Sequence, residues 1–363
     1  MFLWQSDRLP QTVWQNVMAS ERPILVYGMG NGADKLAERL ASLGREVSDY
    51  FASDGFVRGQ IFRGKRVLSK SEALSLYDDP IVLLAFASNR PEVLAMLYGV
   101  DSECDLYMPD LPVSGEDYFD QSFYEINRER ISAAAELFSD DLSREILDAT
   151  LRYKLSGRIA YLRKTGEGIW DMRELLHPEA YRRTLDGGAY SGDTAKELLS
   201  LSPAIEEIVA LEPDRKNYKR LVRYAETEPR VNAICAALLD ADGEIEFSVS
   251  GNRNATLGAG SHGAKRELVR TLRIDSLPGR FDFIKLDVEG AEMQALLGAR
   301  ETILRDRPEL LVSLYHRSED VFALPLLLSE ICDQYDFYLR RNECLPAWEL
   351  HLLAIPREKG NRK

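Results

Sequence analysis

The sequence predicts an α/β protein in which two α/β domains are joined by a helical bridge. In the first hundred residues, apolar runs lead into glycines and then into residues at helical spacing. Between about 115 and 163, charged and apolar residues follow helical spacing with no strand-like run. From about 181 onward, strand-like and helical segments alternate, which is typical of an open, mostly parallel sheet with helices on both faces.

The first domain is predicted over residues 1–112 and is Rossmann-like. Its first apolar strand begins at residue 23 and runs into Gly28 and Gly30, and Gly44 follows a helix as its C-terminal cap. The continuous apolar run at 81–87 is typical of a parallel strand that is buried on both faces. Further elements are predicted as a helix at 33–43 and a strand at 47–51.

The helical bridge is predicted over 113–168, and the second α/β domain over 169–358. The bridge has two predicted helices, at 131–138 and 142–153. Strands of the second domain are predicted near 181–185, 206–211, 231–235, 281–286, 309–315, 337–341 and 350–355. The segment 244–249 alternates with period two, which favours an extra edge strand, and residues 359–363 form a polar tail.

Composition narrows the class of protein. Hydrophobic residues make up 45% of the chain, which is enough to build cores and argues against global disorder. The formal charge of −13 disfavours general binding to nucleic acids, because an acidic surface repels phosphates. No apolar run is long enough for a membrane span, and no secretion signal is evident, so we expect a cytoplasmic protein. The four cysteines are widely spaced, which favours free thiols.

A nucleoside pocket is predicted where two strands of the second domain end. The segment Thr184-Leu-Asp-Gly-Gly-Ala-Tyr-Ser-Gly-Asp193 reads as a strand, a glycine-rich turn and the start of a helix. The next strand ends at Glu212, about twenty residues later, and a carboxylate there can accept both ribose hydroxyls. The turn is acidic, which suits an ammonium and a sulfonium better than a pyrophosphate. These features favour S-adenosylmethionine over NAD.

Residues from about 170 to 356 resemble the FkbM family of S-adenosylmethionine-dependent methyltransferases. The resemblance is carried by Leu185-Asp-Gly-Gly-Ala-Tyr-Ser-Gly-Asp-Thr194, by Ala210-Leu-Glu-Pro-Asp214 and above all by Phe283-Ile-Lys-Leu-Asp-Val-Glu-Gly-Ala-Glu292. Tyr315-His316 and Leu352-Leu-Ala-Ile-Pro356 also fit. It implies a Rossmann-like, seven-stranded class I methyltransferase domain. It also implies methylation of a hydroxyl on a sugar, a polysaccharide precursor or a natural product.

The resemblance also implies which residues bind the cofactor. Asp186 to Tyr190 would surround the methionine portion, Glu212 would hold the ribose, and the strand ending at Cys235-Ala236 would approach the adenine. Asp240 or Asp242 could assist there, and the sequence leaves that choice open. The full predicted cofactor set is Asp186, Gly187, Gly188, Ala189, Tyr190, Asp193, Glu212, Pro213, Ala236 and Asp287.

Three residues are predicted to be catalytic: His316, Asp287 and Glu289. Each follows a buried strand, and an alcohol needs a base before it can accept a methyl group, so we expect His316 or Asp287 to supply it. Glu292 fits either the site or simple stabilisation of a helix N-terminus, which is worth about 0.3–1 kcal/mol. Asp287 and Glu289 could hold a divalent metal, but no cluster of histidines supports one, and we expect none.

The glycines of the N-terminal domain suggest a second candidate binding site. Gly28-Met-Gly-Asn-Gly-Ala33 lies between a strand and a helix, and Asp49 could meet a ribose, so a nucleotide or nucleotide-sugar could bind at Gly28, Gly30 and Asp49. The alternative is a Rossmann-like unit that binds no nucleotide or serves in homodimer formation. Two other functions therefore stay open at this point: a nucleotide-sugar or NAD enzyme acting through this domain, and a non-catalytic cofactor-binding scaffold.

Overall fold

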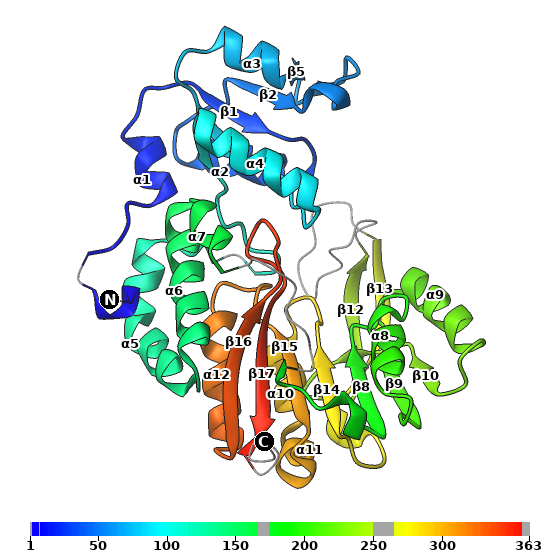
Figure 1. The fold of residues 1–363 in the computed structure, drawn as a ribbon. Helices are drawn as coiled ribbons and strands as arrows, with labels where there is room; N and C mark the ends of the chain where they lie inside the picture. The colour runs from blue at the N-terminus through cyan, green and yellow to red at the C-terminus, as the bar shows by residue number, and fades with distance from the viewer. Residues whose placement is uncertain (1, 7, 116, 166–173, 250–264, 358–363) are drawn as a thin grey trace.

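The computed structural model describes the chain apart from residues 1, 7, 116, 166–173, 250–264 and 358–363 (Figure 1). The polar tail predicted at 359–363 therefore lies outside the described residues. The molecule contains two main sheets, one parallel and one mostly parallel. The N-terminal unit lies above the larger sheet in Figure 1. Helices of the intervening segment lie along one side of the larger sheet, so the architecture is mixed α/β, as predicted.

The N-terminal unit has a five-stranded parallel sheet in the order β5-β2-β1-β6-β7. Its strands are β1 (Ile24–Tyr27), β2 (Asp49–Ala52), β5 (Leu68–Ser69), β6 (Ile81–Leu84) and β7 (Asp105–Tyr107), and β3 (Ile61–Phe62) and β4 (Lys65–Arg66) form a hairpin. Its helices are α1 (Val13–Met18), α2 (Asn31–Ser42), α3 (Lys70–Leu76) and α4 (Pro91–Glu103), with short 3-10 turns at Leu3–Gln5 and Asp54–Phe56. Gly44, just beyond α2, has a φ of +71°, as a C-terminal glycine should.

The helical segment contains α5 (Gln121–Leu137), α6 (Asp141–Ser156) and α7 (Ala160–Arg163). The side chain of Asp120 accepts a hydrogen bond from the backbone of α5, and Asp140 does the same for α6. Helix α5 packs on α12 (Asp320–Ile331), and α6 packs on β16 (Tyr335–Arg341). This segment is therefore more than a bridge, because it packs against α12 and against β16, the strand at one edge of the larger sheet.

The larger sheet has seven strands in the order β10-β9-β8-β14-β15-β17-β16, which confirms the predicted seven-stranded fold. Strand β17 runs antiparallel to both of its neighbours, and the other pairings are parallel. Besides β16, its strands are β8 (Arg183–Gly187), β9 (Glu207–Leu211), β10 (Val231–Ile234), β14 (Phe283–Leu286), β15 (Glu309–Ser313) and β17 (Leu350–Pro356). Besides α12, its helices are α8 (Asp193–Leu201), α9 (Arg215–Ala225), α10 (Glu292–Leu297) and α11 (Arg300–Asp306), with 3-10 turns at Pro178–Ala180 and Ile274–Ser276.

The segment expected to be an extra edge strand pairs elsewhere. Strand β12 (Gly243–Val249) lies in a separate three-stranded sheet with β11 (Ala237–Leu238) and β13 (Lys265–Leu272). Its partner β13 runs antiparallel to it. Strand β12 stands at one edge of this small sheet, so the prediction of an extra edge strand is confirmed, although the strand lies outside the seven-stranded sheet.

The N-terminal unit is joined to the rest by shared core and backbone contacts. Tyr153, Ile159 and Leu345 lie in the same buried hydrophobic cluster as the strands of the N-terminal sheet. Ser88 and Leu345 exchange backbone hydrogen bonds of 2.8 and 2.9 Å. All four cysteines are unpaired. Within the described residues, every helix is too short or too polar to cross a bilayer.

Candidate active site

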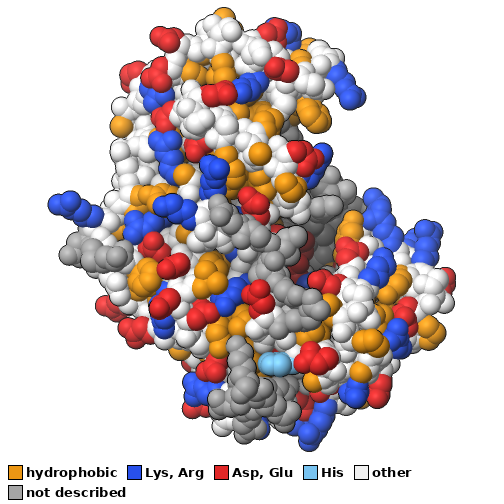
Figure 2. All heavy atoms as spheres, in the orientation of Figure 1, with side chains coloured by type: hydrophobic (Ala, Val, Ile, Leu, Met, Phe, Trp, Pro, Cys, Tyr) orange, Lys and Arg blue, Asp and Glu red, His pale blue; other side chains and the backbone are white. Residues whose placement is uncertain are grey.

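The carboxyl ends of β8, β9 and β14 bring the predicted residues together. Asp186 of β8 is in register with Ala210 of β9 on one side and with Lys285 of β14 on the other. The residues that follow each strand therefore share one edge of the sheet, where open α/β folds bind their ligands. Acidic side chains are visible in the recess beneath the N-terminal unit in Figure 2.

The glycine-rich turn after β8 is fixed between its two neighbouring strands. The N–H groups of Gly188 and Ala189 both donate to the carbonyl of Leu211, at 3.0 and 2.9 Å. Gly188 has a φ of +78°, and a Cβ added there would lie 1.9 Å from the carbonyl oxygen of Asp287. Only glycine fits this close approach. The turn is therefore held in one position relative to the ends of β9 and β14.

The turn continues into α8 through two left-handed residues. Tyr190 has a φ of 48°, and its hydroxyl accepts a hydrogen bond from Arg220 at 3.2 Å. Gly192 has a φ of +88° and precedes Asp193, the first residue of α8. The carboxylate of Asp193 accepts a hydrogen bond from Ser191 at 2.7 Å. Asp193 is thus engaged within its own turn.

Glu212 occupies the position expected of a ribose ligand, directly after β9. Its two carboxylate oxygens accept hydrogen bonds from the backbone N–H groups of Tyr190 and Asp214, each at 2.9 Å. Pro213 lies between Glu212 and Asp214 in the sequence. The side chain is only 6% exposed, and burial raises the pKa of its carboxyl to about 7. Ala236, predicted near the adenine, is buried just beyond β10 at the same edge.

Asp186 forms a buried ion pair. It is fully buried, and its Oδ1 lies 3.3 Å from Nζ of Lys285. Burial raises the pKa of Asp186, and the ammonium of Lys285 opposes that rise. Within the described residues, the second carboxylate oxygen of Asp186 has no hydrogen-bond partner. That oxygen is the part of Asp186 left for a ligand.

Asp287 lies directly after β14 among three potential partners. Its Oδ1 accepts a hydrogen bond from the hydroxyl of Tyr315 at 3.0 Å and lies 3.5 Å from Nε2 of His316. Its Oδ2 lies 3.9 Å from Nζ of Lys285. Burial alone would raise its pKa, but the positive charges of Lys285 and His316 outweigh burial and lower the pKa to about 2. Asp287 is therefore a weak base.

His316 is enclosed by carboxylates. Its Nδ1 lies 2.9 Å from Glu292, and its Nε2 lies 3.6 Å from Glu289. Burial disfavours the imidazolium, but Glu292, Asp287 and Glu289 outweigh burial and raise the pKa of His316 to about 10. In this arrangement the ring is already protonated at neutral pH. The expectation that His316 is the base therefore conflicts with its surroundings, because a protonated imidazole cannot accept a proton.

Glu289 and Glu292 complete this cluster. Glu289 has a φ of 54°, and 40% of its side chain is exposed. Burial and the neighbouring carboxylates raise its pKa to about 7, although His316 opposes that rise. Glu292 is fully buried and accepts a hydrogen bond from the backbone of Val288 at 2.8 Å. Glu292 thus belongs to the site through His316, in addition to any effect on the helix terminus.

Several residues at this edge escaped prediction. Lys285 and Tyr315 stand in the quoted motifs, beside Asp287 and His316 in sequence, so their proximity was available as a signal. Ser114 had no such signal, yet its N–H donates to the carbonyl of His316 at 2.9 Å. Asp320 begins α12, is buried and accepts a hydrogen bond from the backbone of Arg317 at 2.8 Å.

Two carboxylates expected at ribose or adenine lie elsewhere. Asp242 accepts hydrogen bonds from the backbone of Arg273 at 2.7 Å and from the hydroxyl of Ser276 at 2.5 Å, so it stabilises a turn. Asp49 is the first residue of β2, away from the carboxyl end of the strand, where it pairs in register with Leu25 and binds the hydroxyl of Tyr77. The predicted ribose contact of Asp49 is therefore wrong. Strand β2 starts two residues later than expected, and this carboxylate lies at the strand edge opposite the glycine turn.

The glycines themselves do follow β1 as predicted. Gly28 and Gly30 have φ values of 121° and 100°, and Gly30 precedes the first residue of α2. A Cβ added to Gly32 would lie 2.1 Å from the carbonyl oxygen of Ala85. This packing between helix and strand explains Gly32 without a ligand. A nucleotide at this turn stays a prediction.

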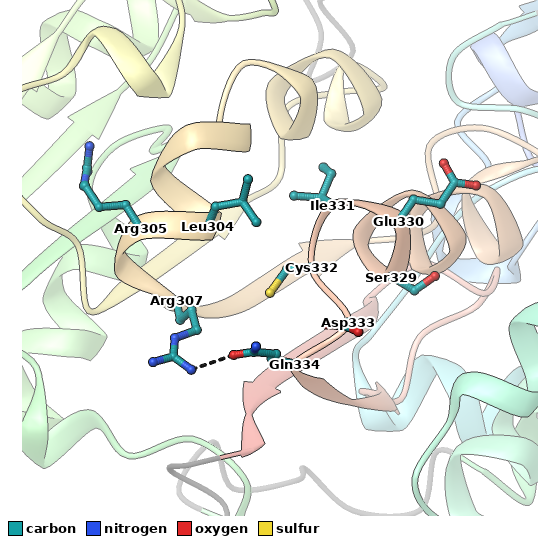
Figure 3. A pocket seen from close by; sticks show the side chains of 9 residues that line it. All are labelled: Leu304, Arg305, Arg307, Ser329, Glu330, Ile331, Cys332, Asp333 and Gln334. Atoms are coloured by element: carbon teal, nitrogen blue, oxygen red, sulfur yellow. Dashed lines mark hydrogen bonds between the residues drawn. The ribbon is translucent and has the colours of Figure 1, made fainter.

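A second hollow lies where α11 and α12 end, at the edge opposite the candidate site (Figure 3). Its lining residues are Leu304, Arg305, Arg307, Ser329, Glu330, Ile331, Cys332, Asp333 and Gln334. Arg307 donates a hydrogen bond to Gln334 at 2.7 Å across it. The basic and acidic side chains in Figure 3 point apart rather than toward one centre. This hollow offers no convergent chemistry.

Comparisons with known proteins agree with this geometry. The model of the methyltransferase FkbM domain matches residues 186–342. The methyltransferase FkbM from Methylobacillus flagellatus KT has a similar fold, with a TM-score of 0.71, 21% identity and coverage of 95% of this chain and 94% of that chain. The comparison with curated proteins gave no match.

More remote similarity extends to other methyltransferase structures. Precorrin-6y C5,15-methyltransferase from Geobacter metallireducens GS-15 has a TM-score of 0.32 and 13% identity, covering 49% of this chain and 84% of that one. Fibrillarin from Aeropyrum pernix has a TM-score of 0.32 and 14% identity, covering 49% and 67%. These two matches are too distant to carry an argument. Residues 186–342 thus match the methyltransferase FkbM domain, and the fold of the chain resembles that of a solved methyltransferase FkbM.

Proposed function

We propose that this chain transfers a methyl group from S-adenosylmethionine to a hydroxyl of a sugar, a polysaccharide precursor or a natural product. The observation that carries the proposal is Glu212. Its carboxylate is buried at the end of β9, and two backbone N–H groups fix its orientation. Each carboxylate oxygen keeps a free lone pair, and a pair of ribose hydroxyls fits that arrangement.

The rest of the cofactor site follows from charge. Asp186 and Asp193 bring negative charge to the turn that would face the methionine portion, which carries an ammonium and a sulfonium. Lys285 pairs with Asp186 and limits the repulsion between Asp186 and Asp287. Ala236 leaves room for a flat ring, because it has a small side chain at the end of β10.

Methyl transfer needs alignment more than covalent help from the protein. Bound S-adenosylmethionine supplies an electrophilic methyl group and a neutral thioether leaving group. The chain must orient the acceptor oxygen in line with the methyl group and take up its proton. We assign to Glu289 the role of the base that takes up the proton of the acceptor hydroxyl, because its carboxylate is the most exposed of the three predicted catalytic groups. Asp287 and His316 then position Glu289 and the acceptor.

The cofactor half of the proposal is tested with Glu212→Gln. The substitution keeps the shape but removes the charge that strengthens hydrogen bonds to the ribose. Loss of charged hydrogen bonds should weaken binding of S-adenosylhomocysteine roughly 10- to 100-fold in calorimetry. Glu206→Gln is the matched control, because Glu206 is exposed just before the same strand. Equal affinity in the two variants would refute the ribose assignment.

The acceptor half is tested with the purified chain and labelled S-adenosylmethionine. The labelled methyl group is transferred into extracts of source cells, and the product is identified by mass spectrometry. A methyl ether on a sugar-containing or polyketide-like compound supports the proposal. Labelled product on nitrogen, carbon or protein would refute transfer to a hydroxyl while leaving methyltransferase activity in place.

A further inference from the structure

We propose that Asp287, Glu292 and His316 bind one divalent cation, of the Mn²⁺ to Zn²⁺ type, at the carboxyl edge of the large sheet. One ligand atom from each residue lies within 4.8 Å of the other two. Atoms bonded to one ion at about 2.0–2.2 Å lie roughly 3–4 Å apart, so small side-chain adjustments close the site. The sequence argued against a metal because it lacks a cluster of histidines, but the fold brings one histidine to two carboxylates.

Unpartnered polar atoms supply an independent observation. Within the described residues, Nε2 of His316 and Oε2 of Glu292 make no hydrogen bond. The His316 side chain is 1% exposed, and that of Glu292 is fully buried. Buried polar atoms without a partner are uncommon in folded proteins, and an ion is one of the explanations for such atoms. A cation between these residues would satisfy atoms that the chain itself leaves unsatisfied.

Further hydrogen bonds from neighbouring residues hold the three proposed ligand residues in place. The hydroxyl of Tyr315 donates to Asp287 at 3.0 Å, and the N–H of Val288 donates to Glu292 at 2.8 Å. The carbonyl of His316 accepts a hydrogen bond from the backbone of Ser114 at 2.9 Å. Metal ligands in proteins are oriented by outer hydrogen bonds of this kind. The arrangement therefore limits the reorganisation that binding would require.

The negative charge of the carboxylates around His316 favours a bound cation over a bound water molecule at this position. Asp287, Glu289, Glu292 and Asp320 gather around His316, and the nearest ammonium, that of Lys285, is closer to Asp186 than to Asp287. Two carboxylate oxygens and one imidazole nitrogen suit a borderline divalent ion, which must displace the proton from His316 to solvent when it binds. The partly exposed side chains of Asp287 and Glu289 provide a path for its entry.

This site does not depend on the proposed reaction, although a cation here would lower the pKa of a hydroxyl bound to it. The test therefore uses the full chain with neither cofactor nor acceptor. After treatment with a chelator and its removal, Mn²⁺ and, separately, Zn²⁺ are titrated by calorimetry, and the Mn²⁺ sample is also followed by electron paramagnetic resonance. One ion should bind per chain, and pulsed measurements should detect a hyperfine coupling to an imidazole nitrogen.

Variants separate this site from nonspecific binding. Asp287→Asn and His316→Gln should each weaken Mn²⁺ binding at least tenfold. His177→Gln is the matched control, because His177 also contacts a buried carboxylate, that of Glu309 at 2.8 Å, at the start of β15. If a variant fails to fold, the nitrogen coupling in the unmodified chain decides. Absence of stoichiometric Mn²⁺ and Zn²⁺ binding, or binding without nitrogen coupling, would overturn the proposal and leave the assignment of Glu212 intact.

Discussion

At the residue scale, the surroundings of a side chain decide what the side chain can do. Glu212 and Glu289 are ordinary acids in the sequence, but burial raises the pKa of each to about 7. Asp287 has the opposite fate, because Lys285 and His316 hold its pKa at about 2. At this sheet edge, Asp287 thus becomes charged at a much lower pH than Glu212 and Glu289.

Cofactor affinity should depend on pH through Glu212. The ribose needs the ionised carboxylate, and a raised pKa means that this form is lost as pH falls through about 7. The affinity for S-adenosylhomocysteine should therefore fall by up to about tenfold per pH unit below that value and level off above it. Calorimetry across this range measures the slope.

Glu212→Gln serves as the reference for this slope. Asp186 and Asp214 face the same carboxylate, and the cofactor has its own titrating amine. These groups contribute equally in the variant, so the difference between the two profiles isolates Glu212. If the variant keeps the full slope, the dependence belongs to another group.

Sequence could predict the place of these residues but not their charge state. Asp287 and His316 each follow a buried apolar strand, so their position at the carboxyl edge was evident. The protonation of His316 depends on Glu289 and Glu292, whose distances from the ring follow from the turn after β14. Asp49 shows the converse: it lies inside the predicted strand 47–51, but it is the first residue of β2, away from the edge where the glycine turn lies.

At the element scale, long apolar runs and the amphipathic helices α2 and α6 were predicted well, whereas short strands and the start of α5 were not. The run at 81–87 and the strands of the second domain stand out because both faces are buried. Strand β7 has only three residues, and its register with β6 supplies the evidence for it. Helix α5 begins ten residues before the predicted start, because its exposed first half is charged and its cap is Asp120.

The contact between the turn after β8 and the end of β14 should be highly sensitive to substitution. Gly188→Ala places a Cβ 1.9 Å from a backbone oxygen that cannot move freely, at a φ of +78°. We expect a loss of about 3 kcal/mol or more in the free energy of unfolding. Urea denaturation measures it.

Gly44→Ala separates backbone strain from the close contact. Gly44 has a similar φ of +71°, but a Cβ there would have no atom within 4 Å. This variant should lose only about 1 kcal/mol, the cost of a left-handed residue with a side chain. Similar losses in the two variants would mean that the turn after β8 can shift, contrary to the geometry described above.

At the scale of the whole molecule, the N-terminal unit and the unit of the large sheet are joined by direct contacts. The linker after β7 passes over the catalytic edge, where Ser114 contacts His316 and Asp117 accepts a hydrogen bond from Ser318. None of these contacts was evident in the sequence, because they join segments about two hundred residues apart. The N-terminal unit thus supports the site whether or not its own glycine turn binds a nucleotide.

One buried ion pair makes this coupling measurable. Nζ of Lys154, in α6, lies 2.7 Å from Asp110 in the linker, and the two side chains are 4% and 10% exposed. Lys154→Met leaves Asp110 buried without its cation, which should cost about 3–5 kcal/mol in the free energy of unfolding.

Because the pair joins the two units, we expect one cooperative unfolding transition that moves as a whole, seen alike by calorimetry and by hydrogen exchange in both units. Lys154→Met with Asp110→Asn should recover part of the loss, whereas Arg66→Ala, which removes an exposed pair with Glu72, should change stability by less than about 1 kcal/mol. Separate transitions, with only the N-terminal unit destabilised, would show that the two units are stable independently and that the linker merely connects them.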